Sequence, residues 1–386
     1  MPQLLTGLDA LQVDGFSLLR GMNVGLLTHP AAVDSHLRSP YNVFTSAENL
    51  TLTALLSPEH GLWGVALNGE YVHSTLDPRT GIPIHSLYGA QMRPTLDMFE
   101  GLDALVVNLQ DVGVRYYTFI WTLTHALDAA GAYGLPVIIL DRPNPFDGLT
   151  VRGPGISAGF ESLVGRVSIP ILHGMTIGEF AKWYNARHNP TPGPLAVVTC
   201  RGWNRTQSWA DIQRPWIPTS PAMPHQSALQ HYPGACFVEG TTLSEGRGTY
   251  LPFEIIGGPG IEPTDLADAL NALNLPGVAY RAHVFKPNLS KHAKTACYGI
   301  QVHPLSREFD PIRVWLSVIV TTRRLFPDHF GWAEPNNDRY HIDLLAGSSS
   351  LRQMVDADAT ADDILAAWDD PAHQFLTDRR EFLLYG

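Results

Sequence analysis

Four predominantly apolar runs in the first 140 residues constrain the fold of this chain most strongly. They cover residues 23–27, 52–56, 104–109 and 136–140. Strands buried on both faces are apolar along their whole length, whereas strands with one exposed face alternate. Residues 117–133, between the third and fourth runs, have apolar side chains at helical spacing. The pattern predicts an α/β fold whose mostly parallel, Rossmann-like sheet is covered by helices on both faces.

Polar side chains directly follow these runs. They are His29, the pair Glu59 and His60, the pair Gln110 and Asp111, and the pair Asp141 and Arg142. In a doubly wound sheet the carboxyl ends of the parallel strands lie at one edge, and ligands bind there. We therefore expect these side chains to meet at one site.

Glu59 has the most informative surroundings of these residues. The strand before it ends at Pro58, because proline has no backbone N–H and cannot continue a central strand. His60 follows Glu59, and Trp63 lies in a glycine-containing turn just beyond. An isolated glutamate is more often a solvated loop residue, but this position after a buried strand favours a functional role.

The chain has 386 residues, which favours two domains over a single core. We expect residues 1–230 to hold the parallel sheet and residues 231–386 to form a smaller, mixed α/β domain. Residues 8–19 have the spacing of one amphipathic helix. Thr176, with Glu179 three residues later, predicts a capped helix start.

The charge and cysteine content argue against several classes of partner. The net charge is −11 and no basic cluster is present, so neither a nucleic acid nor an anionic membrane is an expected partner. The three cysteines are widely spaced and fit a reducing compartment. The first residues lack the features of a signal peptide, and no run is long enough to span a membrane. We expect a cytoplasmic protein with a small-molecule substrate, and the sequence does not predict its oligomeric state.

Several cofactor and catalytic motifs are absent from the sequence. No Gly-x-Gly-x-x-Gly follows the first run, and no phosphate-binding loop with its lysine occurs. The serine-hydrolase and zinc-protease signatures are also missing, and no histidines have a recognised ligand spacing. The sequence therefore predicts neither a cofactor nor a metal ion.

Carboxylates in loops with glycine or proline remain, together with nearby aromatic residues. The carboxylates are Glu59, Asp111, Asp141, Glu239 and Glu245, and the aromatic residues are Trp63, Tyr88, Tyr116 and Tyr117. Glycoside hydrolysis uses one carboxylic acid to protonate the leaving oxygen and a second group to serve a water or the anomeric carbon. Aromatic faces bind the apolar side of a sugar ring. The pattern fits a glycosidase.

Structural roles for some of these residues stay open. Asp111 and Asp141 could cap a helix or pair with an arginine such as Arg115 or Arg142. Arg247 could form a surface ion pair.

Six signatures along the chain resemble one family. They are SPEHG (57–61), SLYG (86–89), QDVGVRYYT (110–118), DRPNP (141–145), HGMT (173–176) and EGTTLSEGRGT (239–249). Together they resemble the NamZ-like exo-β-N-acetylmuramidases, formerly a bacterial domain of unknown function. The likeness continues through GIQVH (299–303) and IDLL (342–345) to FLLY (382–385).

The resemblance implies a Rossmann-like amino domain, a smaller carboxyl domain and an active-site cleft between them. It implies release of terminal N-acetylmuramic acid from peptidoglycan fragments during cell-wall recycling. Glu59 matches the catalytic glutamate of the family and would be the general acid. His60, Asp111 and Glu245 are candidates for the second catalytic group or for positioning. The expected substrate-binding residues are His29, Trp63, Tyr88, Gln110, Arg115, Tyr116, Tyr117, Asp141, Arg142, Asn144, His173, Glu239 and Arg247.

Of these, Arg247 or Arg142 would take the lactyl carboxylate. The chain departs from its relatives in two segments. Residues 28–32 read THPAA where relatives tend to have TNPTG, and residues 219–224 read TSPAMP where PSPNMP is usual. The reaction is therefore better constrained than the sugar. A non-catalytic muropeptide-binding module and a glycosidase for another amino sugar are the alternatives.

Overall fold

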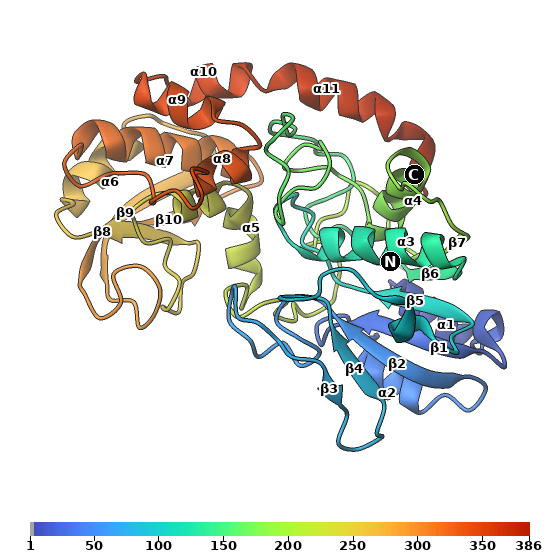
Figure 1. Ribbon diagram of the computed structural model, residues 1–386. Helices are drawn as coiled ribbons and strands as arrows, with labels where there is room; N and C mark the ends of the chain where they lie inside the picture. The colour runs from blue at the N-terminus through green and yellow to red at the C-terminus, as the bar shows by residue number, and fades with distance from the viewer. Residues whose placement is uncertain (1–3) are drawn as a thin grey trace. The chain divides into compact units, whose positions relative to one another are not determined.

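The computed structural model describes residues 4–386, which form two compact units (Figure 1). Unit 1 comprises Met1–Thr150, His173–Pro224 and Leu376–Gly386, and unit 2 comprises Val151–Leu172 and His225–Phe375. The segment 151–172 thus belongs to unit 2, and the last residues of the chain return to unit 1. The single domain boundary expected at residue 230 does not account for these two segments. Among residues 4–386, no helix has the length and apolar character needed to cross a membrane.

Unit 1 is built on a seven-stranded sheet in the order β3-β4-β2-β1-β5-β6-β7. The strands are β1 (Asn23–Thr28), β2 (Thr51–Ser57), β3 (Thr75–Leu76), β4 (Pro83–Ser86), β5 (Ala104–Asn108), β6 (Val137–Leu140) and β7 (Leu195–Val198). All neighbouring strands are parallel except β3, which pairs antiparallel with β4 at the edge. The predicted mostly parallel sheet is therefore confirmed.

The order of the parallel strands predicts where a ligand binds to the sheet. Taken in chain order, the six parallel strands lie in the spatial order 3-2-1-4-5-6. In doubly wound sheets with this order, ligands bind beyond the carboxyl ends of the strands where the order reverses. That position lies between β1 and β5, next to β2.

Helices cover both faces of this sheet. The helical segments of unit 1 are α1 (Gly7–Val13), η1 (Ser17–Leu19), α2 (Pro40–Thr45), η2 (Leu96–Phe99), α3 (Phe119–Tyr133), α4 (Ile177–Arg187) and η4 (Arg380–Phe382). Leu26 and Val106 pack with side chains of α1 and α2 in one core cluster. The next residues, Leu27 and Val107, point to the opposite face and are equally buried. α4 contacts α3, β6 and β7.

Unit 2 contains a three-stranded antiparallel sheet in the order β8-β10-β9. Its strands are β8 (Ile255–Gly258), β9 (Val278–Phe285) and β10 (Cys297–Pro304). Its helices are α5 (Gln226–Ala235), η3 (Cys236–Gly240), α6 (Pro263–Asn271), α7 (Pro311–Leu325), α8 (His341–Ala346), α9 (Ser350–Asp356) and α10 (Ala361–Ala366); α11 (Asp369–Asp378) follows them. α6 contacts α7, β9 and β10. Unit 2 thus combines a small sheet with helices, as predicted.

Two predicted helix boundaries have opposite outcomes. The helix start at Thr176 is confirmed, because its hydroxyl and the Glu179 carboxylate form a reciprocal capping box at α4. The single helix predicted for residues 8–19 is wrong. α1 ends at Val13, because Gly15 and Phe16 both adopt left-handed backbone conformations that a right-handed helix cannot contain.

Candidate active site

Glu59 lies at the carboxyl end of β2, where three segments of unit 1 enclose it. Its side chain is buried. Oε2 accepts a hydrogen bond from Oγ1 of Thr118 at 2.8 Å, and Oε1 accepts one from the backbone N–H of Gly69 at 3.1 Å. The end of β2, the following loop and the start of α3 therefore fix the carboxylate at the ligand-binding edge of the sheet.

The loop after Glu59 turns sharply at His60. His60 has a φ of 72°, in the left-handed region that non-glycine residues rarely adopt. Its Nδ1 donates to the carbonyl of Ala66 at 2.8 Å, which closes the base of the loop. Trp63 is 51% exposed, and its ring meets the edge of Tyr41 at 5.4 Å between centroids. His60 shapes this loop, while Trp63 has an exposed aromatic ring four residues after Glu59 in the chain.

Two tyrosines lie close to Glu59. Burial, together with the negative charge of the nearby Glu59 carboxylate, raises the pKa of the Tyr88 phenol. Burial also raises the pKa of Tyr117, and the carboxylates of Glu59 and Asp111 both add to the effect. The Tyr117 phenol is therefore within electrostatic range of both carboxylates.

Asp111 and His173 form a buried pair beside Tyr117. Oδ2 of Asp111 accepts the N–H of Gly113 at 2.6 Å and lies 4.0 Å from Nε2 of His173. Among the described residues, no donor reaches Oδ1 of Asp111 and no acceptor reaches Nε2 of His173. Burial raises the pKa of Asp111 to about 7, against the opposing effect of the backbone N–H groups. Asp111 shows no arginine pair and no helix-capping bond among these contacts.

The protonation of His173 follows from its surroundings. Burial lowers the pKa of His173 to about 3, so the ring is neutral near pH 7. Nδ1 accepts the N–H of Met175 at 3.3 Å. The single ring proton is therefore on Nε2, the atom that lies toward Asp111.

His29, Gln110 and Arg142 form a second buried chain of contacts. Nε2 of His29 accepts the backbone N–H of Gln110 at 2.9 Å, and the Gln110 side-chain oxygen accepts from Nε of Arg142 at 2.8 Å. Burial, aided by Arg142 and His60, lowers the pKa of His29 well below its ordinary value. Nη1 of Arg142 donates to the carbonyls of Ala32 and Val33. This internal use of the guanidinium argues against Arg142 as the receptor for a lactyl carboxylate.

Asp141 has a structural environment. Its carboxylate accepts from the N–H of Gly178 at 2.7 Å and the hydroxyl of Thr176 at 2.8 Å, both at the start of α4. The N–H of Arg142 and the hydroxyl of Tyr385 also donate to it. Asp141 is fully buried, so these contacts favour the helix-terminus alternative over sugar binding.

Three other predicted binding residues are also buried in unit 1. Asn144 donates to the carbonyl of Met175 at 3.0 Å and accepts from the N–H of Phe146 at 3.0 Å. Arg115 and Tyr116 lie in the interior just before α3, and burial lowers the pKa of Arg115 to about 10. These side chains support the edge of the sheet from within.

The predicted residues of unit 2 form a separate ionic cluster. Arg247 pairs with Glu239 at 2.5 Å and with Glu245 at 3.5 Å, and Lys291 lies 2.9 Å from Glu245. Burial alone would raise the pKa of Glu239, but Arg247 and His341 hold it at about 2. Only 16% of the Arg247 side chain is exposed. The cluster is thus a largely buried network rather than a surface ion pair.

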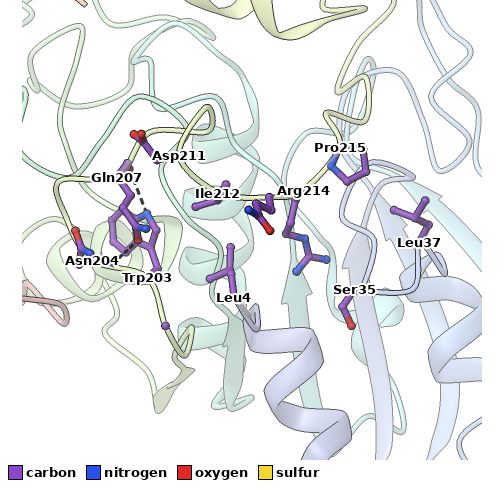
Figure 2. Close-up of a pocket in the computed structure, with 12 residues that line it drawn as sticks. Leu4, Ser35, Leu37, Trp203, Asn204, Gln207, Asp211, Ile212, Arg214 and Pro215 are labelled. Atoms are coloured by element: carbon purple, nitrogen blue, oxygen red, sulfur yellow. Dashed lines mark hydrogen bonds between the residues drawn. The ribbon is translucent and has the colours of Figure 1, made fainter. Parts of the chain in front are cut away.

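An open cavity of about 660 Å³ lies elsewhere in unit 1, along residues 202–215. Figure 2 shows Arg214 between Leu37 on one side and Trp203 and Gln207 on the other. The guanidinium of Arg214 pairs with Asp9 at 2.8 Å. None of the predicted catalytic or substrate-binding side chains lines this cavity, so the candidate site at Glu59 is distinct from it. Within the described part of the chain, no group of three or more histidine, cysteine or acidic residues is arranged to hold a metal ion.

Comparison with known proteins decides the family. Residues 24–227 match the family model described as "Exo-beta-N-acetylmuramidase NamZ, N-terminal", and residues 230–385 match the corresponding C-terminal model. The chain belongs to the NamZ family. The resemblance inferred from the six signatures is therefore confirmed.

Individual NamZ-family relatives support the assignment along the whole chain. The chain is 39% identical over 385 residues to the "Peptidoglycan beta-N-acetylmuramidase NamZ" of Bacillus subtilis (strain 168), covering 100% of this chain and 92% of that protein. A crystal structure of a DUF1343 family protein from Bacteroides fragilis has a TM-score of 0.92 at 33% identity, with 100% of both chains covered. A second DUF1343 protein from that organism has a TM-score of 0.78 at 27% identity over 99% of both chains.

Sequence reasoning missed several contacts in this NamZ-family chain. Thr118 lies within the QDVGVRYYT signature, and only its position there could have drawn attention to it. The N–H of Gly69 has no side-chain signal at all. Lys291 and His341 lie far along the chain from the EGTTLSEGRGT signature whose carboxylates they contact.

Proposed function

We infer that this chain is an exo-acting glycoside hydrolase that releases terminal N-acetylmuramic acid from peptidoglycan fragments. The observation that carries the inference is the enclosed Glu59 carboxylate at the carboxyl end of β2, next to Tyr88, in a NamZ-family chain. Release of this sugar from wall fragments belongs to cell-wall turnover and recycling.

Glu59 is the general acid in this proposal. It transfers a proton to the glycosidic oxygen as the bond to the anomeric carbon breaks. Thr118 and Gly69 hold the carboxyl group in place, and the phenol of Tyr88 lies beside it. A carboxyl group fixed by three segments loses little entropy when it aligns with the leaving oxygen.

The lactyl carboxylate has a less defined receptor. The guanidinium of Arg142 is engaged inside unit 1, and Arg247 is engaged by Glu239 and Glu245. A lactyl carboxylate would have to compete with those two glutamates for Arg247. We keep Arg247 as the candidate, because its partners leave it partly exposed.

The test compares wild type with Glu59→Gln on two substrates. One is the natural disaccharide of N-acetylmuramic acid and N-acetylglucosamine, whose leaving group needs protonation. The other is a 4-nitrophenyl β-N-acetylmuraminide, whose leaving group does not. We expect Glu59→Gln to lower kcat for the disaccharide by about 10²- to 10⁴-fold and for the aryl glycoside by much less.

Glu70→Gln is the matched control, because Glu70 is exposed on the same loop and its carboxylate contacts only the loop N–H of Leu67 among the bonds described. Equal activity of wild type and Glu59→Gln would remove Glu59 from the mechanism. Tight binding of the disaccharide without turnover would favour the binding-module alternative. Faster cleavage of the corresponding N-acetylglucosaminide would favour a glycosidase for another amino sugar.

A further inference from the structure

Asp111 differs from the other buried carboxylates of unit 1 in its hydrogen bonding. Both oxygens of Asp9, Asp34, Glu59, Asp141 and Glu179 accept hydrogen bonds, and at least one oxygen of Asp77 and of Asp128 does. Among the carboxylate oxygens of this set that are closed off from solvent, Oδ1 of Asp111 is the one for which no described residue is a hydrogen-bond donor. A buried carboxylate oxygen without a donor is costly, and such exceptions in folded proteins call for an explanation.

The turn at residues 111–113 fixes the orientation of the Asp111 carboxylate. Oδ2 accepts the N–H of Gly113, which has a φ of 74°. A side chain at residue 113 would come within 2.3 Å of the Asn144 oxygen, so glycine is required in this turn. The neutral ring of His173 closes another side with its Nε2–H at 4.0 Å from Oδ2. The turn thus leaves Oδ1 of Asp111 with no hydrogen-bond donor among the described residues, and no cation balances the carboxylate among these contacts.

The substrate of the proposed reaction supplies a matching donor. N-acetylmuramic acid carries an acetamido group on C2, next to the anomeric carbon that reacts. Its N–H is a neutral donor, and its carbonyl oxygen is a nucleophile that can reach C1. Glu59 follows β2 and Asp111 follows β5, and both strands pair in parallel with β1, so a sugar ring bound at these strand ends would meet both carboxyl groups.

We propose that Asp111 accepts the acetamido N–H of the substrate and orients the acetamido carbonyl oxygen for attack on C1, so that hydrolysis is substrate-assisted. The inference rests on the proposed function and names the second catalytic group of that site. Asp111 is then a catalytic residue, and His173 is a positioning residue that acts through it.

The two steps balance without any reactant other than water. In the first step the carbonyl oxygen forms a bond to C1, the C1–oxygen bond to the leaving sugar breaks, and Glu59 gives its proton to the departing oxygen. The resulting oxazolinium ion carries positive charge on nitrogen, which Asp111 stabilises. In the second step water attacks C1 from the opposite face, the bond between C1 and the acetamido oxygen breaks and restores the acetamido group, and the Glu59 carboxylate takes the water proton. Two displacements at C1 give overall retention of the β configuration.

The environment of Asp111 suits this task better than activation of a water. Burial raises the pKa of Asp111, so its carboxylate interacts with a positively polarised hydrogen atom more strongly than a solvated carboxylate does. Such a group stabilises the charge that develops on the amide nitrogen. It also benefits from a ligand N–H more than a solvated carboxylate would, because no water competes for the bond.

The first test needs no variant. Wild type should release N-acetylmuramic acid initially as the β anomer, seen by NMR before mutarotation, and the thiazoline analogue of N-acetylmuramic acid should inhibit it competitively. Replacement of the acetyl group by trifluoroacetyl should slow hydrolysis at least tenfold, because the carbonyl oxygen becomes a poorer nucleophile. Initial release of the α anomer, or hydrolysis unaffected by the thiazoline, would overturn the assignment while leaving the muramidase function intact. Absence of any muraminide hydrolysis would overturn both.

The second test uses Asp111→Asn and the matched control Asp103→Asn. Asp103 precedes β5 and Asp111 follows it, so the two substitutions alter opposite ends of one strand. We expect Asp111→Asn to lower kcat at least 100-fold and to weaken thiazoline binding at least tenfold, with Asp103→Asn unchanged in both. Unchanged thiazoline binding by a folded Asp111→Asn would contradict the assignment. His173→Gln should show a smaller loss of kcat together with a shifted pH profile, which a purely structural role would not produce.

Discussion

The hydroxyl of Thr118 donates to Oε2 of Glu59 at 2.8 Å rather than capping its own helix. Thr118 is the N-cap residue of α3, a position where a threonine hydroxyl usually accepts a backbone N–H of the first turn. No such cap bond is present here. The side chain is thus used for the neighbouring carboxyl group instead of for helix stability.

Thr118→Val tests this relationship. The substitution removes one hydrogen bond to a catalytic carboxylate, and we expect kcat to fall about tenfold, equivalent to ~1.5 kcal/mol. The free energy of unfolding should fall by about 1–3 kcal/mol, because the buried Oε2 of Glu59 loses its donor even though no cap bond is lost. Thr118→Ser should restore most of the activity, since it keeps the hydroxyl. Kinetics on the disaccharide and thermal unfolding measure both effects.

Thr122→Val is the control for a buried threonine on the same helix, because the Thr122 hydroxyl donates only to the carbonyl of Thr118 among the bonds described. Its kcat should stay near that of wild type. A Thr118→Val variant as active as wild type would show that this bond does not position Glu59.

The parallel sheet could be predicted because its signals are local. Four of its strands are apolar runs that end at turns, and the capping box at Thr176 needs only residues 176–179. β9, from Val278 to Phe285, was not predicted, because exposed residues interrupt its apolar pattern. α5 was also missed, since Pro233 lies inside it and proline usually excludes a helix interior.

The site was predictable in position but not in its contacts. The carboxyl-end rule places Glu59 and Asp111 at the same edge, and both lie there. The roles of their neighbours depend on partners far along the chain. Thr118 is 59 residues from Glu59, and the carbonyls that engage Arg142 are more than 100 residues from it. From the sequence alone an arginine can be taken as available to bind a ligand. Only the folded structure shows whether its N–H groups already donate to other residues of the protein.

Asp111 should make the folded protein less stable as the pH rises. Its pKa is raised to about 7 in the folded state from an ordinary value of 3.8. Below pH ~4 Asp111 is protonated in both the folded and the unfolded state, so no charge is buried on folding. Between pH ~4 and ~7 only the unfolded chain ionises, and folding becomes less favourable. Above pH ~7 the folded state carries the full free-energy cost of a buried charge. Asp111→Asn removes this cost. We expect its free energy of unfolding to exceed that of wild type by up to ~4 kcal/mol at pH 8, with the difference shrinking toward pH 4.

Urea unfolding of wild type, Asp111→Asn and Asp103→Asn across this pH range provides the measurement. Asp103 is exposed, so its variant should follow the wild-type curve. A stability difference for Asp111→Asn that does not vary with pH would contradict the raised pKa. The more stable but less active variant would also show that the site keeps this carboxylate at a cost to stability.

Arg247 should contribute strongly to the stability of unit 2. It is the cation between Glu239 and Glu245 in a largely buried network. Arg247→Met leaves Glu239 without its main partner and Glu245 with Lys291 alone, and we expect a loss of about 3–5 kcal/mol in unfolding free energy. Arg247→Lys keeps the charge but lacks the two-pronged contact with Glu239, so its loss should be smaller.

Kinetics of Arg247→Lys separate this structural role from substrate binding. If Arg247 also binds the lactyl carboxylate, KM should rise for an N-acetylmuraminide but not for the N-acetylglucosaminide, which lacks the lactyl group. An equal change for both substrates would assign Arg247 to structure only. Arg352→Lys, in the Arg352–Asp343 pair of the same unit, controls for the loss of a guanidinium.

Trp63 should bind substrate through its exposed ring. The side chain is 51% exposed, and one ring edge contacts Tyr41, so its removal leaves little unfilled space in the core. We expect Trp63→Ala to raise KM for the disaccharide about 3- to 10-fold, equivalent to ~0.5–1.5 kcal/mol of aromatic contact, and to leave kcat nearly unchanged. Tyr133 offers a matched control, because it is 44% exposed and meets the edge of Phe99 in a similar geometry. Tyr133→Ala should leave KM unaltered, since it lies at the far end of α3 from Glu59, and an equal rise in KM for both variants would rule out a specific role for Trp63.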